Sequence, residues 1–395
     1  MAARPCDESR PVCSNCQQRQ EPCDYDTQLP FIWADRTGRS KEREIESSNP
    51  SQLKEHVPTE TAFSFLHRAG VTGAQMVPAP SLDMSQLKLL VRWQADTYKT
   101  FVRSEETKHV WQALVVEEAL HNPFLMHRIL AVSALHVSLT EAELEKTFWL
   151  GLASAHNSEA LHLFVRRLTD INSTNAKAMV GFAGLVVAFA FGSALTGLSE
   201  PDKPSLDALN NIFVLCRGVQ ETTNTAFSQL LKGTFAPLFD ARVPQAAVPR
   251  KVKQALEYLT NLNAERSVES GHEAATYMPA IEALRDLSVY TYAQPASLTL
   301  AVGWAIKATP AHLDHVQMKR PFALVVHAYY CAFLHISRGN WCIGSWGKCV
   351  LEEIYHILDP DWRAHIRWPV EEVFGDDVIK YHTAQALQIS ERQRK

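Results

Sequence analysis

The sequence predicts an all-α protein. From about Asp83 to the end of the chain, apolar residues recur at spacings of three and four in one segment after another, which is the period of a helix face. No pair of alternating strands joined by a hairpin turn is visible. The chain has 395 residues, 46% of them hydrophobic and 21% charged, so a small module and a large helical domain can each have a core.

The first helices of this domain are predicted from apolar spacing and from capping residues. One apolar face is expected to contain six residues: Met84, Leu87, Leu90, Val91, Tyr98 and Phe101. Asn122 is expected to cap the next helix, because Pro123 follows it at a position where a missing N–H costs nothing. Thr140-Glu141-Ala142-Glu143 is typical of a capping box and predicts a helix through Phe148 and Leu152.

Later helices follow the same pattern. Ser205 is predicted to begin a helix that carries Leu209, Phe213 and Cys216 on its apolar face. Two further apolar series continue it: Val252, Leu256, Leu259 and Leu262, then Trp346, Val350, Ile354 and Leu358.

The segment from Ala178 to Ser199 has no charged residue, which is nearly the length of a membrane span. Glycine, serine, threonine and alanine dilute its hydrophobicity, and no basic cluster flanks it. A helix that is apolar all round inside a large domain has the same composition. The sequence therefore favours a buried core helix, with no membrane span.

Three regions are predicted along the chain. Residues 1–25 hold four of the eight cysteines, residues 26–82 form a polar and largely disordered linker, and residues 83–395 form the helical domain. The first residues lack the apolar stretch of a secretory signal, so we expect an intracellular protein whose cysteines are thiols or metal ligands. The net charge of −4 leaves nucleic-acid contact to a local patch.

Four cysteines near the N-terminus have the spacing C-x6-C-x2-C-x6-C: Cys6, Cys13, Cys16 and Cys23. Zinc prefers four soft ligands in a tetrahedron, and a tight C-x2-C loop supplies two of them. A segment this short and polar cannot bury enough apolar surface to fold alone, so metal binding would stabilise it. The spacing predicts a zinc site rather than four unrelated thiols.

These cysteines and their neighbours resemble the second half of the fungal zinc binuclear cluster of transcription factors. The resemblance lies in Cys6–Cys16 (CDESRPVCSNC) and Glu21–Tyr25 (EPCDY). In that family six cysteines hold two zinc ions. By alignment Cys6 corresponds to the third of them and only five residues precede it, so at most one zinc ion is expected here.

The resemblance also implies that the basic segment which reads promoter DNA is absent. The candidates for DNA contact are three arginines near the cysteines: Arg4, Arg10 and Arg19. Four carboxylates share residues 1–25 with them, so the local charge is −1, the wrong sign for a DNA-binding patch.

Residues 83–374 resemble the fungal-specific transcription factor domain, in the branch of the sterol uptake control proteins. The opening match includes Trp111, His121–His127 and Ala131–His136, and the closing match includes Ala328–Tyr330 and Ile366–Glu371. The resemblance implies a nuclear RNA polymerase II regulator whose helical domain holds a sterol-like or secondary-metabolite-related ligand. The candidate pocket residues, for which close helix packing is the competing interpretation, are Gly181, Gly184, Phe189, Phe322, Tyr329 and Phe333.

Two versions of this function stay open. In one, the chain belongs to a regulator that binds promoter DNA, with a homodimer as one assembly. In the other, it acts through ligand or partners without reading DNA. The remote alternative is an α-helical enzyme, but no motif has the spacing that catalysis requires, and His312-Leu313-Asp314-His315 lacks the HExxH pattern.

Overall fold

The computed structural model describes residues 82–141, 145–167, 172, 174–197, 204–230, 233–240 and 246–375, with only the backbone of residues 219–229. The chain divides into two units, Met1–Ala79 and Pro80–Lys395, and all described residues belong to the second. Every regular element in this described part is helical, which confirms the predicted fold class.

The domain begins with a series of short helices. They are α3 (Met84–Ala95), η2 (Thr97–Phe101), α4 (Glu105–His109), the π-helical turn η3 (Val110–Leu114) and α5 (Val115–His121). The carboxylate of Asp83 caps α3 by accepting hydrogen bonds from the backbone N–H groups of Ser85 and Gln86. Ser104 and Thr107 form a capping box at α4.

The predicted apolar face of the first helix is wrong. Met84, Leu87 and Val91 are exposed, whereas Leu89 and Trp93 are fully buried. Helix α3 presents the face of Leu89 and Trp93 to the core instead, and it ends at Ala95, so Tyr98 and Phe101 enter the core from η2.

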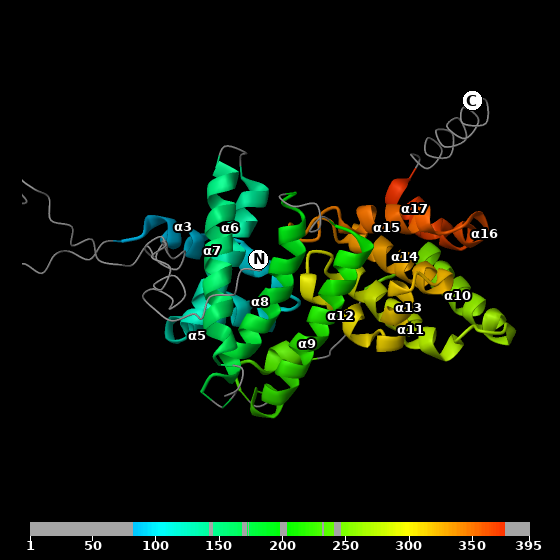
Figure 1. Cartoon of the computed structure of the whole chain (residues 1–395). Coiled ribbons are helices and arrows are strands. Elements are labelled where there is room, and N and C mark those ends of the chain that lie inside the picture. The colour runs from blue at the N-terminus through cyan, green and yellow to red at the C-terminus, as the bar shows by residue number, and fades with distance from the viewer. Residues whose placement is uncertain are drawn as a thin grey trace, which may run out of the picture. The chain divides into compact units, whose positions relative to one another are not determined.

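Two long helices, α6 (Pro123–Thr140) and α7 (Lys146–Val165), lie side by side and antiparallel, as Figure 1 shows. Asn122 occupies the N-cap position of α6 as predicted, but its side chain does not cap. Its Nδ2 donates instead to the carbonyl oxygen of Glu118, at 2.8 Å. The predicted capping box at Thr140 is also wrong, because Thr140 is the last residue of α6 and α7 begins only at Lys146. The Thr140 hydroxyl donates back to the His136 carbonyl oxygen.

Helix α8 (Ala176–Ala194) contains most of the uncharged segment and is largely buried. Among the described residues, α6 and α8 are long and apolar enough to cross a membrane by length and composition. In α6 72% and in α8 67% of the apolar 18-residue stretch is buried inside the protein. Such burial is expected of core helices. Ser205 starts α9 (Leu206–Leu230), as predicted, and its hydroxyl accepts a hydrogen bond from the Ala208 N–H.

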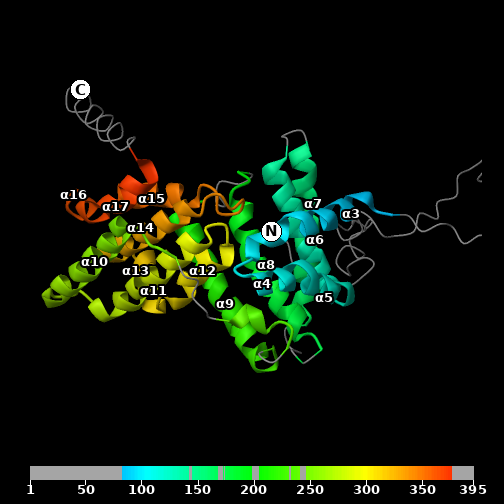
Figure 2. The ribbon, with the colours of Figure 1, turned by 180° about the vertical axis from the view of Figure 1, so that it is seen from behind.

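The remaining helices form the C-terminal part of the domain. They are η6 (Ala236–Phe239), α10 (Arg250–Glu265), η7 (Arg266–Val268), α11 (Ala274–Ala293), α12 (Leu298–Lys307), α13 (Pro310–Gln317), α14 (Pro321–Ile336), α15 (Trp346–Ile357), α16 (Pro360–Arg363), η8 (Ala364–Ile366) and α17 (Arg367–Phe374). Views from both sides place α8 and α9 between α3–α7 and α10–α17 (Figures 1 and 2). One apolar cluster, from Trp93 to Val373, joins these groups.

Helix α14 is the centre of the C-terminal part, since every residue from Phe322 to Leu334 is buried. Helix α15 crosses it closely at Gly347, where a Cβ would lie 2.6 Å from the backbone nitrogen of His335. Only glycine allows this approach, because the neighbouring atoms are backbone and cannot rotate away. The crossing fixes α14 and, through it, the helices that surround the site described next.

Candidate functional site

A cavity of about 590 Å³ opens between α10, α14, η8 and α17. Its lining combines an apolar base with a polar rim. The lining residues are Lys251, Gln254, Ala255, Tyr258, Tyr329, Ala364, His365, Arg367, Trp368 and Glu371. This volume is within the range of small-molecule sites in proteins.

The base of the cavity is aromatic. Tyr329, on α14, is only 1% exposed, and its ring centroid lies 5.3 Å from that of Trp368 on α17. Phe333 also packs against the Trp368 ring system, at 5.5 Å. Burial raises the pKa of Tyr329 well above its ordinary value, so its hydroxyl stays neutral and donates to the His365 carbonyl oxygen. The base therefore presents uncharged, mostly apolar surface.

The rim holds a defined hydrogen-bond chain. Arg266 Nη2 lies 3.4 Å from Nε2 of His365, and the Tyr258 hydroxyl oxygen lies 2.6 Å from His365 Nδ1. An arginine can only donate, so Nε2 accepts and the imidazole proton sits on Nδ1, which donates to Tyr258. Burial, with the Arg266 charge second, lowers the pKa of His365 and keeps the ring neutral. The Tyr258 hydroxyl hydrogen is then available to a bound molecule.

The Nε1–H of Trp368 is buried behind the lining and has no hydrogen-bond partner among the described residues, so it does not face the open cavity. The charged rim residues are already neutralised, since Lys251 pairs with Glu372 at 2.5 Å and Arg367 with Glu371 at 2.6 Å. The cavity thus offers the neutral hydroxyl donor of Tyr258 beside an aromatic base, an arrangement that suits an apolar molecule carrying an oxygen acceptor.

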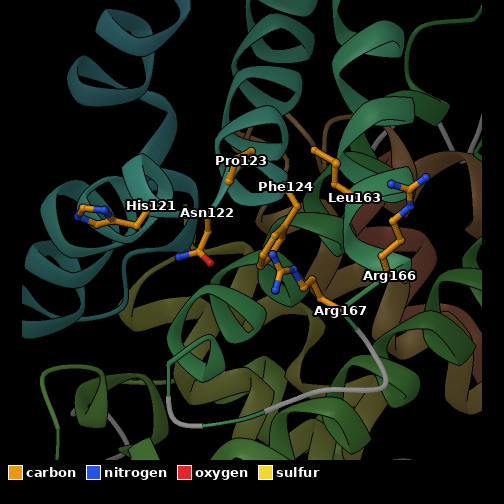
Figure 3. A pocket seen from close by; sticks show the side chains of 7 residues that line it. All are labelled: His121, Asn122, Pro123, Phe124, Leu163, Arg166 and Arg167. Atoms are coloured by element: carbon orange, nitrogen blue, oxygen red, sulfur yellow. The ribbon is translucent and has the colours of Figure 1, made fainter.

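A second cavity, of about 370 Å³, lies where α6 begins and α7 ends. Figure 3 shows the seven side chains that line it: His121, Asn122, Pro123, Phe124, Leu163, Arg166 and Arg167. Its two arginines give it a positive rim without an ion pair among the described residues, and Phe124, which packs on Phe164 and Phe182, is its aromatic base. A hydrophobic ligand fits the cavity at α14 better.

The candidate pocket residues fall in two separate parts of the domain. Gly181, Gly184 and Phe189 are on α8, whereas Phe322, Tyr329 and Phe333 are on α14. A Cβ on Gly184 would lie 2.8 Å from the Trp111 ring, and one on Gly181 would lie 3.5 Å from Leu125. These two glycines lie against core side chains. On α14, Tyr329 lines the large cavity and Phe333 supports it from behind Trp368, while Phe322 packs on Tyr277.

Of the ten lining residues only Tyr329 was among the sequence-based candidates, and the missed residues include the three that define the site: Tyr258, His365 and Trp368. Tyr258 lies on the flank of the predicted α10 stripe, where the apolar period gives no reason to select it. His365 and Trp368 are brought beside it by η8 and α17, which are distant in sequence. The predicted zinc ligands and the candidate DNA-contacting arginines lie outside the described residues.

The most deeply buried histidines belong to the core. His312 and His327 are fully buried among Trp304, Phe213 and Tyr330, and burial lowers the pKa of each to about 3. Both rings are therefore neutral. Among the described residues no group of three or more histidine, cysteine or acidic side chains is placed to hold a metal ion.

Comparison with known proteins identifies relatives for the first part of the domain. Residues 89–190 match the family described as fungal specific transcription factor domain. The chain is 30% identical over 115 residues to sterol uptake control protein 2 of Candida albicans, which covers 29% of this chain and 15% of that protein. It is 29% identical over 131 residues to sterol uptake control protein 2 of Saccharomyces cerevisiae, covering 33% and 14%.

The chain therefore spans about one seventh of the length of these relatives. The matched segment begins in α3 and ends in α8, so it contains the short N-terminal helices and the α6–α7 pair. Residues 89–190 are thus similar to the fungal specific transcription factor domain, and the two relatives are named for the control of sterol uptake.

Proposed function

We propose that the chain regulates transcription and that its helical unit is the regulatory part, acting in the nucleus. The observation that carries this proposal is the match of residues 89–190 to the fungal specific transcription factor domain. The matched residues belong to one group of packed helices, α3 to α8, in which Leu89, Trp93 and Trp111 are buried. The relatives named for control of sterol uptake support the same function.

Comparing the transcripts of cells that express the chain with those of cells that express a folding-defective variant tests this function. Gly347→Leu is the suitable variant, because its side chain would collide with the backbone of α14. We expect a defined set of transcripts to change only with the wild-type chain. Identical transcript profiles would contradict the proposal.

The helical unit is further proposed to bind a hydrophobic small molecule in the cavity at α14. The support is the aromatic base of Tyr329 and Trp368, together with the free donor of Tyr258. Since the relatives are named for sterol uptake control, a sterol-like molecule or a related secondary metabolite is the first class to test.

A neutral fluorescent probe that carries a carbonyl oxygen, such as Nile red, measures this binding on the full chain. Ala255 lines the cavity, so Ala255→Phe should fill part of it and weaken binding at least about tenfold. Ala264→Phe is the matched control, because Ala264 is exposed on the same helix. Equal affinities for the two variants would contradict a ligand site here.

Zinc is proposed as the metal of the N-terminal cysteines, held by Cys6, Cys13, Cys16 and Cys23. The support is their spacing alone. Metal analysis of the purified chain should give about one zinc ion per chain, and Cys13→Ser with Cys16→Ser should abolish it. Cys216→Ser, at a buried core thiol, should leave the zinc content unchanged. A zinc-free wild-type chain would contradict this site.

Promoter DNA is the partner proposed for a form of this protein that carries the complete six-cysteine zinc cluster. Residues 1–25 have a charge of −1 and supply no positive patch for DNA, and both versions stay open: a regulator that binds promoter DNA, and one that acts through a ligand or partners without reading DNA. A gel-shift assay separates the two versions. Tight, sequence-selective binding by the 395-residue chain would contradict the second one.

A further inference from the structure

Large apolar side chains are exposed mainly on two helices that both pack on α6. Of the thirteen such side chains in the described part of the chain, seven are on α3, at its N-terminal flank or on α7. They are Leu82, Met84, Leu87, Val91, Phe148, Leu161 and Val165. The two helices are neighbours, since Lys88 Nζ of α3 lies 4.6 Å from the Trp149 ring of α7.

Helix α7 does not have the pattern of a surface helix. Its inner face, with Trp149, Ala153 and Ala160, packs on α6. Its exposed residues after Lys146 carry no formal charge, and they are Thr147, Phe148, Gly151, Ser154, Ala155, Ser158, Leu161, His162 and Val165. A surface helix normally places charged residues outward, whereas the outward face of α7 mixes apolar and uncharged polar residues, with the partly buried Glu159 at its edge. Phe148 and Val165 are 55% and 60% exposed.

The charges that flank α7 lie at its two ends and have opposite signs. Glu145 precedes the helix, and Arg166 and Arg167 follow it. Neither arginine makes an ion pair within the described residues. Lys146, at the acidic end, already has an interaction of its own within the chain. Glu145 accepts a hydrogen bond from Trp149 Nε1 at 3.0 Å and lies 4.0 Å from Lys88 Nζ, but its side chain is still 63% exposed. A second α7 in antiparallel orientation would bring each pair of arginines to the other copy's Glu145.

The side-chain sizes fit the same orientation. With a two-fold axis between Ala155 and Ser158, Phe148 of one copy would lie against Val165 of the other. Small residues then occupy the crossing, and a Cβ on Gly151 would meet no atom within 4 Å, so the space there is open. Small residues at the crossing let two helices approach to about 8 Å.

We propose that two copies of this chain associate through the outer faces of their α7 helices, antiparallel and related by a two-fold axis. A two-fold arrangement uses the same patch on both copies and closes at the dimer. Helix α7 is about 30 Å long, and a stable interface buries about 800 Å² on each partner. The dimer is expected to form at micromolar concentration.

Sedimentation velocity on the 395-residue chain, from about 1 to about 100 µM, tests the association. We expect the mass to shift from one to two chains over this range. Ala155→Arg places two charges at the crossing and should raise the dissociation constant at least about tenfold. Val268→Arg is the control, because Val268 is 89% exposed on η7 and should leave the dimer unchanged.

A chain that stays monomeric throughout, or a dimer that Ala155→Arg leaves intact, would overturn the proposal. Circular dichroism establishes that the variant is folded, and Phe148→Ser with Val165→Ser provides a second disruption should Ala155→Arg unfold. A cysteine pair tests the orientation. Phe148→Cys with Val165→Cys should give a disulfide between these two positions of different copies, identified by mass spectrometry. Val165→Cys alone should give none, because the two copies of residue 165 would lie about 25 Å apart.

Discussion

The Tyr258 hydroxyl oxygen lies 2.6 Å from Nδ1 of His365, and this contact joins α10 to η8 at the rim of the large cavity. Arg266 donates a hydrogen bond to the other ring nitrogen of His365. The Tyr258 hydroxyl therefore accepts a hydrogen bond from Nδ1–H, and its own O–H can donate to a ligand. The polar end of the cavity is thus set by three residues from elements that meet only in the folded chain.

Tyr258→Phe removes that donor and should weaken binding of a carbonyl-bearing apolar probe about fivefold to tenfold, since a neutral hydrogen bond contributes about 1 kcal/mol. Fluorescence titration measures the effect. Tyr290→Phe, at a tyrosine outside this cavity, is the control and should bind as the wild type does. Equal weakening by both variants would remove Tyr258 from the site.

Gly347→Ala should destabilise the domain by about 2 kcal/mol or more, because a Cβ there meets the backbone of α14 and neither helix can yield cheaply. Gly303→Ala, inside α12, is the matched control. Its Cβ meets nothing within 4 Å, so the loss of backbone freedom in the unfolded chain should stabilise the domain by about 0.5–1 kcal/mol. Urea unfolding measures both changes, and effects of the same sign would contradict the close crossing.

His312 and His327 should make the domain sensitive to acid. Burial lowers the pKa of each to about 3, below the value of about 6.5 in the unfolded chain, so protonation favours unfolding. Their contribution is fully present above pH 6.5 and falls by about 1.4 kcal/mol per group and pH unit as the pH drops from 6.5 toward 3.

Unfolding free energies measured at several pH values between about 6.5 and 3 test this predicted loss of stability per pH unit. His312→Phe with His327→Phe should reduce the loss of unfolding free energy per pH unit, and the remainder comes from His136 and His156, whose pKa burial lowers to about 4. The exposed His162→Gln should leave it unchanged. A double variant that retains the wild-type slope would assign the acid sensitivity to other groups.

Arg128 is a buried cation whose hydrogen bond goes to a neutral side chain. It is 1% exposed, its Nη1 donates to Asn157, and Nε and Nη2 have no hydrogen-bond partner among the described residues. Its guanidinium lies over the Phe182 ring, 4.5 Å from the centroid, and burial lowers its pKa to about 10.

Arg128→Met keeps most of the length of the side chain and removes the buried charge, so its unfolding free energy should equal or exceed that of the wild type. Arg128→Ala leaves a cavity and should lose about 2–5 kcal/mol. Urea unfolding compares the two. A methionine variant as unstable as the alanine variant would show that the charge itself stabilises the core.

Helix positions could be predicted from the sequence where apolar period and turn residues agree. Ser205 starts α9 and Trp346 starts α15, as their spacing indicates. The face of α3 could not be predicted, because exposed Met84 and Val91 follow the helical period as well as buried Trp93 does. Periodicity identifies an apolar stripe, but not whether another element covers it.

The cavity was predictable only in part. Tyr329 lies in a run of apolar residues that indicates a buried helix, and the structure places it at the cavity base. Its partners Tyr258 and His365 come from elements that meet α14 only through tertiary packing. The glycines of α8 indicated close approach, but whether a ligand or a ring fills that space depends on where Trp111 lies.

The most direct test of the regulatory role is a tethering assay. The 395-residue chain is fused to an unrelated DNA-binding domain and directed to a reporter promoter, with the Gly347→Leu variant as the folding control. We predict that the wild-type chain changes reporter expression and that the variant, at equal protein level, does not. Reporter expression equal to that of the DNA-binding domain alone would contradict the regulatory role.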